Sequence, residues 1–261
     1  MPFPKSVAAY YIDEYKNHIW VELIELNDDE ISKFKANVMD SSMIKFKKGE
    51  IVIAEASARP GRRITLRNAN NVNNPESSLG FRVRRGGING FIMTAHGNTG
   101  GRVGQILRVS NDSSSRMHIP NSTARVRNAR VDAAYCRPID NVTLSRRVHH
   151  QSDPNYQLAT GTGGSTVGQV IWQAGNRTQI TRGTIQARNV AVNVRCPVLG
   201  VMSHTHLMRG SYHSDGGDSG GAVYRLSTGS RGRVAVGIHV ASNGHYCSAS
   251  NIISALDVTP Y

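Results

Sequence analysis

The sequence predicts a mainly β protein, and three observations support this prediction. The chain of 261 residues contains 26 glycines, its apolar residues make up only 39%, and its apolar runs are short and broken by Gly, Asn and Ser. Such runs between turn residues are typical of β-strands rather than of helices. At this length the chain can bury a substantial core, either as one large domain or as a smaller domain with an appendage.

The charge distribution divides the chain into two segments. All seven lysines lie within residues 1–55, and all 24 arginines lie within residues 56–261. The first segment has 7 basic and 10 acidic residues, a net charge of −3, and the second has 24 and 8, a net charge of +16. We therefore expect two domains with these boundaries and with complementary charge.

The first domain is expected to be a small α/β unit. Residues 18–25 alternate apolar and polar side chains and predict a strand. Residues 28–39 offer an N-cap and helical spacing of apolar residues, and residues 43–46 can form a second strand. A unit of about 40 residues is only marginally stable alone, so it would gain from docking on something larger.

The second domain begins with a turn-rich stretch. Residues 57–74 are rich in Arg, Asn and turn residues, and a series of short strands follows from Leu79 to about Ser242. Residues 251–256 predict a short closing helix.

The string Gly-Asp-Ser-Gly-Gly at residues 217–221 is the strongest chemical signal. A serine hydroxyl becomes a useful nucleophile on an exposed tight turn, beside a base and near amide donors. The flanking glycines permit that turn, and the N–H groups of Gly217 and Ser219 could form an oxyanion hole. Asp218 is expected to hold the loop through a buried ion pair. The alternative is an ordinary glycine-rich hairpin turn.

Two further residues complete a catalytic set with Ser219. His96 directly follows an apolar strand, which gives a base a fixed backbone and an open approach. Asp132 lies inside an apolar run, where a carboxylate without a partner would be costly to bury. The Nδ1 proton of His96 would supply that partner. Asp112 and Asp140 are alternatives in more polar, turn-like surroundings.

The order His96, Asp132, Ser219 resembles the chymotrypsin-like serine peptidase superfamily. Within it, the streptogrisin and alpha-lytic protease branch of bacteria is the most similar, over residues 79–261. The strings that carry this resemblance are G-D-S-G-G-A-V at the serine, G-F-I-M-T-A-H-G from Gly90, V-A-V-G-I-H from Val234 and the terminal I-I-S-A-L-D-V-T-P-Y.

The resemblance implies an all-β fold of two six-stranded antiparallel barrels with the triad in the cleft between them. It also implies a monomeric, secreted serine endopeptidase that acts on polypeptides through an acyl-enzyme on Ser219 and needs no cofactor. The alternative is a catalytically weak or inactive binding protein with the same fold. Residues 10–55 resemble the end of the prosegment of these enzymes, which acts as folding template and inhibitor; the alternative there is an unrelated linker domain.

The chain departs from the family pattern at several positions. Met93 stands where a threonine is usual, with Thr94 one place later, and Gly97 replaces the cysteine after the histidine, so a nearby disulfide is absent. Val240 stands where many relatives have a serine that supports the triad aspartate. None of these changes removes a catalytic group.

Substrate preference is expected to be for Glu, or Asp, before the scissile bond. Gly237-Ile238-His239 resembles the strand of glutamyl endopeptidases in which a histidine meets the substrate carboxylate, and Ser214 and His213 could add polar contacts. Glu76 is the single glutamate after Glu55, so an enzyme of this preference would largely spare itself, with processing expected after these two residues. Alternatively, His239 merely packs in its strand. The expected substrate-binding residues are His213, Ser214, His239, Val240, Ala241 and Ser242.

Other classes of protein are less well supported. The net charge of +13 invites nucleic-acid binding, but aromatic residues make up only 6%, and we expect no nucleic-acid partner. No apolar stretch is long enough to span a bilayer, and residues 1–20 lack the apolar core of a secretory signal. No zinc-like spacing joins the histidines and cysteines, so no metal is expected, and the three cysteines are expected to be buried free thiols. The candidates for a metal site are His149, His150, Cys196, His204 and His206.

Overall fold

The computed structural model describes residues 6–13, 15–49, 57–66, 76–97, 106–109, 116–139, 142–149, 156–196, 199–227 and 232–261. The chain divides into two compact units, residues 1–55 and 56–261. Glu55, Asp112, Asp140 and His150 lie outside the described residues. No helix among the residues described is long and apolar enough to cross a membrane.

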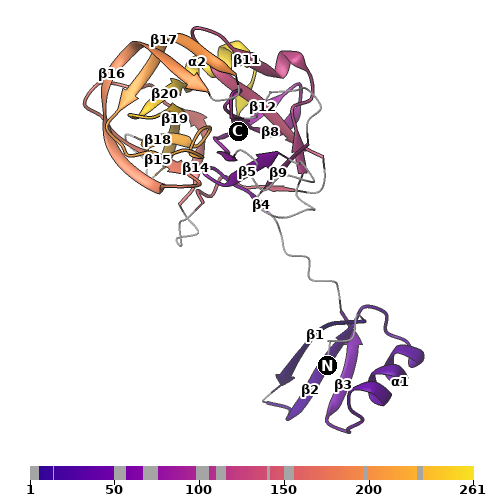
Figure 1. Ribbon diagram of the computed structural model, residues 1–261. Coiled ribbons are helices and arrows are strands. Elements are labelled where there is room, and N and C mark those ends of the chain that lie inside the picture. The colour runs from indigo at the N-terminus through magenta and orange to yellow at the C-terminus, as the bar shows by residue number, and fades with distance from the viewer. Residues whose placement is uncertain are drawn as a thin grey trace. The chain divides into compact units, whose positions relative to one another are not determined.

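The first unit is a three-stranded sheet with one helix (Figure 1). Its elements are β1 (Val7–Asp13), β2 (His18–Leu23), α1 (Asp28–Asn37) and β3 (Ile44–Lys48). The central strand β2 pairs antiparallel with β1 and parallel with β3. Helix α1 begins where the Asn27 side chain accepts a hydrogen bond from the Glu30 amide, and its Phe34 packs on Val21 and Leu23. The strand–helix–strand unit is therefore present, with β1 in addition.

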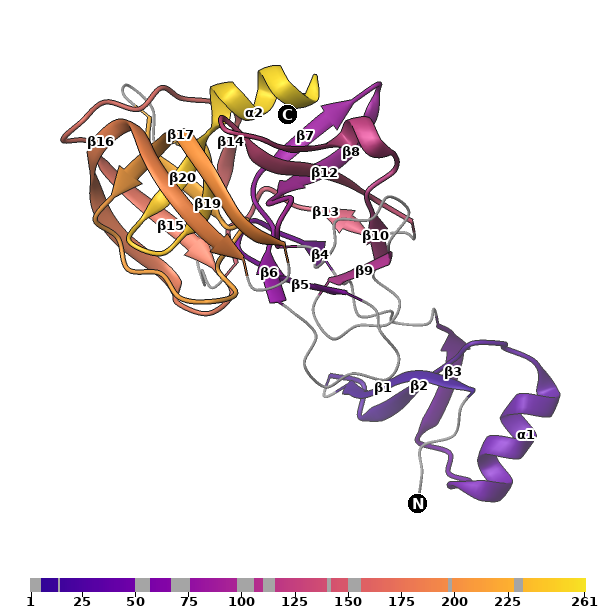
Figure 2. The same ribbon diagram turned by 45° about the horizontal axis from the view of Figure 1, so that its top comes forward.

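The second unit contains two large sheets, antiparallel except where β14 pairs parallel with β19 (Figure 2). Among its described residues, nine strands form the first sheet, and the short pair β4 (Ser57–Ala58) and β13 (Thr143–Leu144) stands apart from it. The nine strands are β5 (Arg63–Leu66), β6 (Glu76–Ser78), β7 (Arg82–Arg85), β8 (Ile88–Met93), β9 (Ile106–Val109), β10 (Arg116–His118), β11 (Arg125–Arg127), β12 (Asp132–Pro138) and β21 (Thr259–Pro260).

The second sheet closes into a barrel. Six of its strands follow one another from β19 to β20, and β19 and β20 also pair with each other, which closes the ring. The first sheet does not close over the residues described. The strands of the second sheet are β14 (Leu158–Thr162), β15 (Val170–Gly175), β16 (Gln179–Cys196), β17 (Gly200–Gly210), β18 (Ala222–Leu226), β19 (Arg233–Ala241) and β20 (His245–Ser248). The predicted all-β, double-barrel fold class is confirmed.

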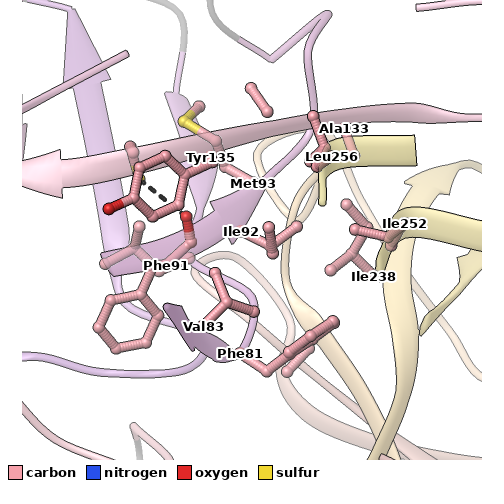
Figure 3. Close-up of a cluster of buried hydrophobic side chains, with 14 of the residues drawn as sticks. Phe81, Val83, Phe91, Ile92, Met93, Ala133, Tyr135, Ile238, Ile252 and Leu256 are labelled. Atoms are coloured by element: carbon pink, nitrogen blue, oxygen red, sulfur yellow. Dashed lines mark hydrogen bonds between the residues drawn. The ribbon is translucent and has the colours of Figure 1, made fainter. Parts of the chain in front are cut away.

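One hydrophobic core joins the two sheets. Helix α2 (Ala249–Leu256) and strand β19 bring apolar side chains against the first sheet (Figure 3). At Gly80 the approach is so close that an added Cβ would lie 2.7 Å from Ile238 Cγ2. The short 3-10 helix η1 (Ser122–Ala124) precedes β11. The labelled side chains of this core are Phe81, Val83, Phe91, Ile92, Met93, Ala133, Tyr135, Ile238, Ile252 and Leu256.

Candidate active site

The three residues predicted to act together lie within hydrogen-bond distance. His96 follows β8, Asp132 opens β12, and Ser219 lies in the loop before β18. His96 Nδ1 is 2.9 Å from Asp132 Oδ2, and His96 Nε2 is 3.1 Å from Ser219 Oγ. A carboxylate only accepts hydrogen bonds, so Nδ1 carries the proton and Nε2 is left to accept one from Ser219.

The carboxylate of Asp132 is buried but remains charged. It is 1% exposed, and it accepts a second hydrogen bond, of 3.0 Å, from the backbone amide of His96. Burial alone would raise the pKa of Asp132, but the hydrogen bonds and charge of His96, with a smaller effect of His204, hold that pKa below its usual value. Asp132 can therefore stabilise a positive charge on the His96 ring.

The loop that carries Ser219 depends on two glycines in left-handed conformations. Gly217 has a φ of 106° and Gly220 a φ of 92°, values that L side chains rarely adopt. An added Cβ at Gly220 would also collide with the carbonyl of Ser78. The glycines around the serine are thus required by the backbone.

Asp218 fixes the same loop, but among the described residues it does so through hydrogen bonds and not through the ion pair expected from the sequence. Its carboxylate accepts hydrogen bonds from the amides of Arg177, Thr178 and Asp215 at 2.8, 3.2 and 2.9 Å, and from the Thr178 hydroxyl at 2.6 Å. Four donors satisfy a buried carboxylate without a counter-ion. The expectation failed because no sequence pattern reveals which backbone amides converge on a side chain.

Strand β6 supports the nucleophile loop from the other sheet. The Ser77 hydroxyl and the Ser78 amide donate to the Ser219 carbonyl at 2.5 and 2.7 Å. The Ser78 hydroxyl donates to the Gly217 carbonyl at 2.8 Å and accepts from the Asn176 amide at 2.9 Å. These contacts hold the backbone next to the nucleophile.

Sequence reasoning missed this support because the stretch before Leu79 reads as a turn-rich loop. The string Glu76-Ser77-Ser78 carries no apolar alternation, yet it pairs with β5. Ser77 also accounts for the departure at Gly97: a Cβ there would collide with the hydroxyls of Ser77 and Thr94. Hydroxyl groups thus surround the position that the resemblance assigns to a cysteine.

The backbone amides of Gly217 and Ser219 remain available for a substrate oxygen. Within the described part of the chain, neither amide donates to another protein atom, whereas the amides of Asp218, Gly220 and Gly221 all do. Two free N–H groups on either side of a constrained loop are suited to an oxyanion that forms next to Ser219.

A cleft of about 710 Å³ opens at Ser219. Five of the six expected substrate-binding residues line it, whereas the side chain of His213 is exposed and does not. His213 lies one residue from Ser214, so the turn directs the two side chains differently. The expected lining residues are Ser214, His239, Val240, Ala241 and Ser242, and Glu76, Asn193 and His245 are among those that the sequence did not suggest.

His239 is a buried neutral imidazole at the wall of this cleft. The Tyr212 hydroxyl and His239 Nδ1 are 3.0 Å apart. Burial lowers the pKa of His239 to about 4, an effect that Asp218 opposes and His96 and His245 assist. Burial also keeps the pKa of Tyr212 well above its usual value, so the phenol keeps its proton and can donate it to Nδ1. In that arrangement the imidazole carries its own proton on Nε2.

Two neighbours add to the polar character of this wall. The Ser214 hydroxyl is buried and has no hydrogen-bond partner among the described residues. His245 Nδ1 lies 2.7 Å from the Ser242 carbonyl, to which it donates. The Asn243-Gly244 pair in the sequence indicates a hairpin turn, from which the place of His245 could have been predicted. This turn folds β20 back on β19 and places His245 opposite Ala241.

Among the cysteines and the metal candidates, Cys196 lines the cleft and His204 lies beside Asp132. Cys136, Cys196 and Cys247 are buried free thiols, and burial raises the pKa of both Cys136 and Cys247 to about 12. Over the described parts of the chain, no three His, Cys, Asp or Glu side chains gather in a way that could hold a metal ion.

Comparison with solved structures places this geometry in a known fold. The crystal structure of Nocardiopsis protease superposes with a TM-score of 0.61 at 24% identity, covering 78% of this chain and 99% of that one. This chain has the fold of the chymotrypsin-like serine peptidases. A glutamic-acid-specific serine protease, described as using a histidine triad in substrate binding, superposes with a TM-score of 0.56 at 24% identity, covering 78% and 100% of the two chains.

Sequence comparison adds two relatives, one named as a serine protease and the other as a glutamyl endopeptidase. Serine protease 1 of Streptomyces fradiae is 39% identical over 97 residues, which is 37% of this chain and 23% of the relative. Glutamyl endopeptidase 2 of Streptomyces griseus is 37% identical over 105 residues, 37% of this chain and 50% of the relative. The chain thus spans a quarter to half of these relatives. Residues 1–49 match the Pro-like C-terminal domain family. The resemblance to bacterial chymotrypsin-like peptidases with a prosegment is confirmed.

Proposed function

We propose that this protein is a serine endopeptidase that forms an acyl-enzyme on Ser219. One observation carries the proposal: the His96 ring bridges Asp132 at 2.9 Å and Ser219 at 3.1 Å. The open cleft at Ser219 and the free amides of Gly217 and Ser219 support it. Two relatives that match part of this chain are named as a serine protease and a glutamyl endopeptidase, which agrees with this chemistry.

The groups of the site divide the steps of the reaction between them. His96 Nε2 takes the proton of Ser219 as the hydroxyl oxygen attacks the carbonyl carbon of the substrate. The negative oxygen that forms accepts hydrogen bonds from the amides of Gly217 and Ser219. His96 then gives its proton to the leaving amine. A water molecule, deprotonated by His96 in the same way, next attacks the acyl-enzyme and releases the acyl group. Asp132 keeps Nδ1 protonated and stabilises the charged imidazole throughout.

A fluorophosphonate probe tests this assignment directly. The purified protein should be labelled at Ser219, as located by mass spectrometry, and should hydrolyse peptides, whereas Ser219→Ala should do neither. Ser250→Ala, which changes an exposed serine in α2, should behave as the parent. His96→Ala and Asp132→Ala should each lower hydrolysis by several orders of magnitude without additivity. A folded parent that takes no label would instead be a binding protein with the peptidase fold.

We further infer a preference for Glu, and to a lesser degree Asp, before the scissile bond. His239 offers Nε2–H at the wall of the cleft because Tyr212 occupies Nδ1. The Ser214 hydroxyl, which has no hydrogen-bond partner in the described part of the chain, adds a second donor. Donors in a partly desolvated site suit a carboxylate.

Two peptides that differ only in Glu or Gln before the scissile bond test this preference. The parent should cleave the Glu peptide at least about 10-fold faster, because a charged partner strengthens the hydrogen bond. His239→Ala should remove most of that ratio, and His213→Ala should leave it unchanged because His213 lies outside the cleft. Preferred cleavage after apolar or basic residues in both parent and variant would exclude the carboxylate site.

Residues 1–55 are proposed to act as a prosegment that inhibits the second unit until it is cut away, and the protein is expected to be exported. The opposed net charges of −3 and +16 support this role, as does the match to the Pro-like domain family. Of the two expected processing sites, the bond after Glu55 is preferred. Glu76 opens β6, pairs with Arg63 at 2.5 Å and accepts from Asn176 at 2.9 Å, so cleavage there would first require this strand to open.

Mass spectrometry over time tests the processing step. The parent should shorten itself to a form that begins at Ala56, with a rise in activity, while Ser219→Ala should keep its full mass. Glu55→Gln should slow the shortening. A parent that stays intact and is fully active at full length would have no zymogen step.

A further inference from the structure

A second histidine lies directly behind the triad aspartate. His204 lies on β17, with its side chain fully buried, and its Nε2 is 3.9 Å from Asp132 Oδ2. Among the described residues, neither ring nitrogen of His204 makes a hydrogen bond of good geometry, although the backbone of Asn128 lies near enough to act on its pKa. A buried imidazole with such weak hydrogen bonding is costly, and the buried carboxylate beside it offers a physical reason for its place.

The carboxylate of Asp132 has room for another donor. Both hydrogen bonds described for it come from His96. Val240, a buried apolar residue, stands where the sequence resemblance assigns a supporting serine. His204 approaches the same carboxylate from a different element, since β17 lies against the segment before β12 through the bond from the Thr205 amide to the Ala129 carbonyl, 2.8 Å.

Burial favours the neutral form of His204, and the charged groups around it act in both directions. Burial lowers the pKa of His204, Asp132 raises it, Arg127 and His96 lower it again, and a hydrogen bond with the Asn128 backbone opposes them. Arg127 Nε lies 3.8 Å from Asp132 Oδ2, so the carboxylate already has a cationic neighbour. A neutral imidazole with its proton on Nε2 can donate to Asp132 without adding a second positive charge.

We propose that His204 is a positioning residue, which directs Nε2–H at Asp132 Oδ2 and holds the carboxylate in the orientation that His96 requires. This role rests on the proposed peptidase function. At 3.9 Å the contact is electrostatic, and a side-chain movement of about 1 Å brings it to hydrogen-bonding distance. Loss of the donor would let the carboxylate reorient and weaken its hold on the protonated Nδ1 of His96.

Three variants test this role. His204→Phe keeps an aromatic ring but removes the donor, and it should lower both kcat and the rate of fluorophosphonate labelling at Ser219 about 10-fold, with KM nearly unchanged. His204→Gln retains an N–H donor and should recover most of the loss. His206→Phe, two residues along β17 and partly exposed, is the matched control and should behave as the parent.

A measurement on the unaltered protein depends neither on the folding of a variant nor on catalytic activity. Nitrogen-15 NMR at neutral pH should find His204 neutral with its proton on Nε2, and a proton on Nδ1 would overturn the proposal. A folded His204→Phe with parental kcat and labelling rate would overturn it as well. If the unaltered protein shows the Nε2 tautomer but neither labels nor hydrolyses peptides, the peptidase function fails and the contact with Asp132 stands.

Discussion

At the scale of single residues, the catalytic groups are held by neighbours that take no part in bond breaking. Ser78 is an example: its one hydroxyl both donates to the Gly217 carbonyl and accepts from the Asn176 amide. It therefore connects the first sheet, the nucleophile loop and the segment after β15. The orientation of the Gly217 amide depends on this backbone being fixed.

Replacing Ser78 by alanine tests that connection. Ser78→Ala leaves the Asn176 amide and the Gly217 carbonyl without their partner, and it should lower kcat by about 10- to 100-fold, the effect of losing one oxyanion donor or less. KM should change little, because Ser78 does not line the cleft. Steady-state kinetics on one peptide substrate measures both. Thr65→Ala, a buried hydroxyl on the adjacent strand β5, serves as control. A drop confined to KM would contradict the argument.

The sequence predicts the triad because each member has a local signature, such as the glycines around Ser219. It does not predict the side chains that act on those members from distant strands. His204 reaches Asp132 across 72 positions of the chain, and no periodicity or spacing marks it. The contact of Tyr212 with His239 Nδ1, at 3.0 Å, has no mark in the sequence either.

At the scale of elements, the pairing of β8 with β12 carries both His96 and Asp132. The two strands run antiparallel, with Met93 opposite Ala134 and Phe91 opposite Cys136. Gly90, near the start of β8, allows the Tyr135 ring and the Cys136 carbonyl to approach closely. This pairing was predictable as two apolar strands, but the need for glycine at position 90 was not, because it depends on the partner strand.

Adding a methyl group at Gly90 should therefore disturb the site from a distance. In Gly90→Ala the new Cβ would collide with the Cys136 carbonyl, a backbone atom that cannot turn away. We expect a loss of about 2 to 4 kcal/mol in the free energy of unfolding, as for other overpacked core positions. Gly161→Ala in β14 is the matched control, since nothing lies within 4 Å of its added Cβ, and it should stay within about 0.5 kcal/mol of the parent. Urea unfolding of both variants measures this, and equal stability would contradict the packing argument.

At the scale of the whole molecule, the fold class and the two-segment organisation follow from composition and from recurrent short strands. Which sheet closes into a barrel cannot be predicted in this way, because closure depends on which strand pairs with which. Strand β20 pairs with both β17 and β19 and so completes the ring. Nothing in the sequence of its four residues, His245 to Ser248, indicates that this strand pairs with two others.

The buried histidines make the stability of the second unit depend on pH. His239 has a pKa of about 4 in the folded chain against an ordinary 6.5. Below about pH 6.5 the unfolded chain binds a proton that the folded chain excludes, so this contribution is fully present above 6.5 and is lost as the pH falls toward 4. His204, whose pKa is also lowered, acts in the same direction. Asp132, whose pKa is lowered by folding, reduces the stability only below its ordinary pKa of 3.8.

Urea unfolding followed by tryptophan fluorescence at pH 7 and pH 4.5, in a Ser219→Ala background that prevents self-cleavage, measures this dependence. His239 should account for about 2 kcal/mol of the decrease between these two pH values, from its shift in pKa. His239→Gln, which does not titrate, should show a decrease smaller by about that amount. Tyr212→Phe retains the histidine and loses only the hydroxyl, so it should keep the acid dependence of the parent. If His239→Gln and Tyr212→Phe lose stability equally on acidification, His239 is not the group that titrates, and its ring must already be charged or solvated in the folded chain.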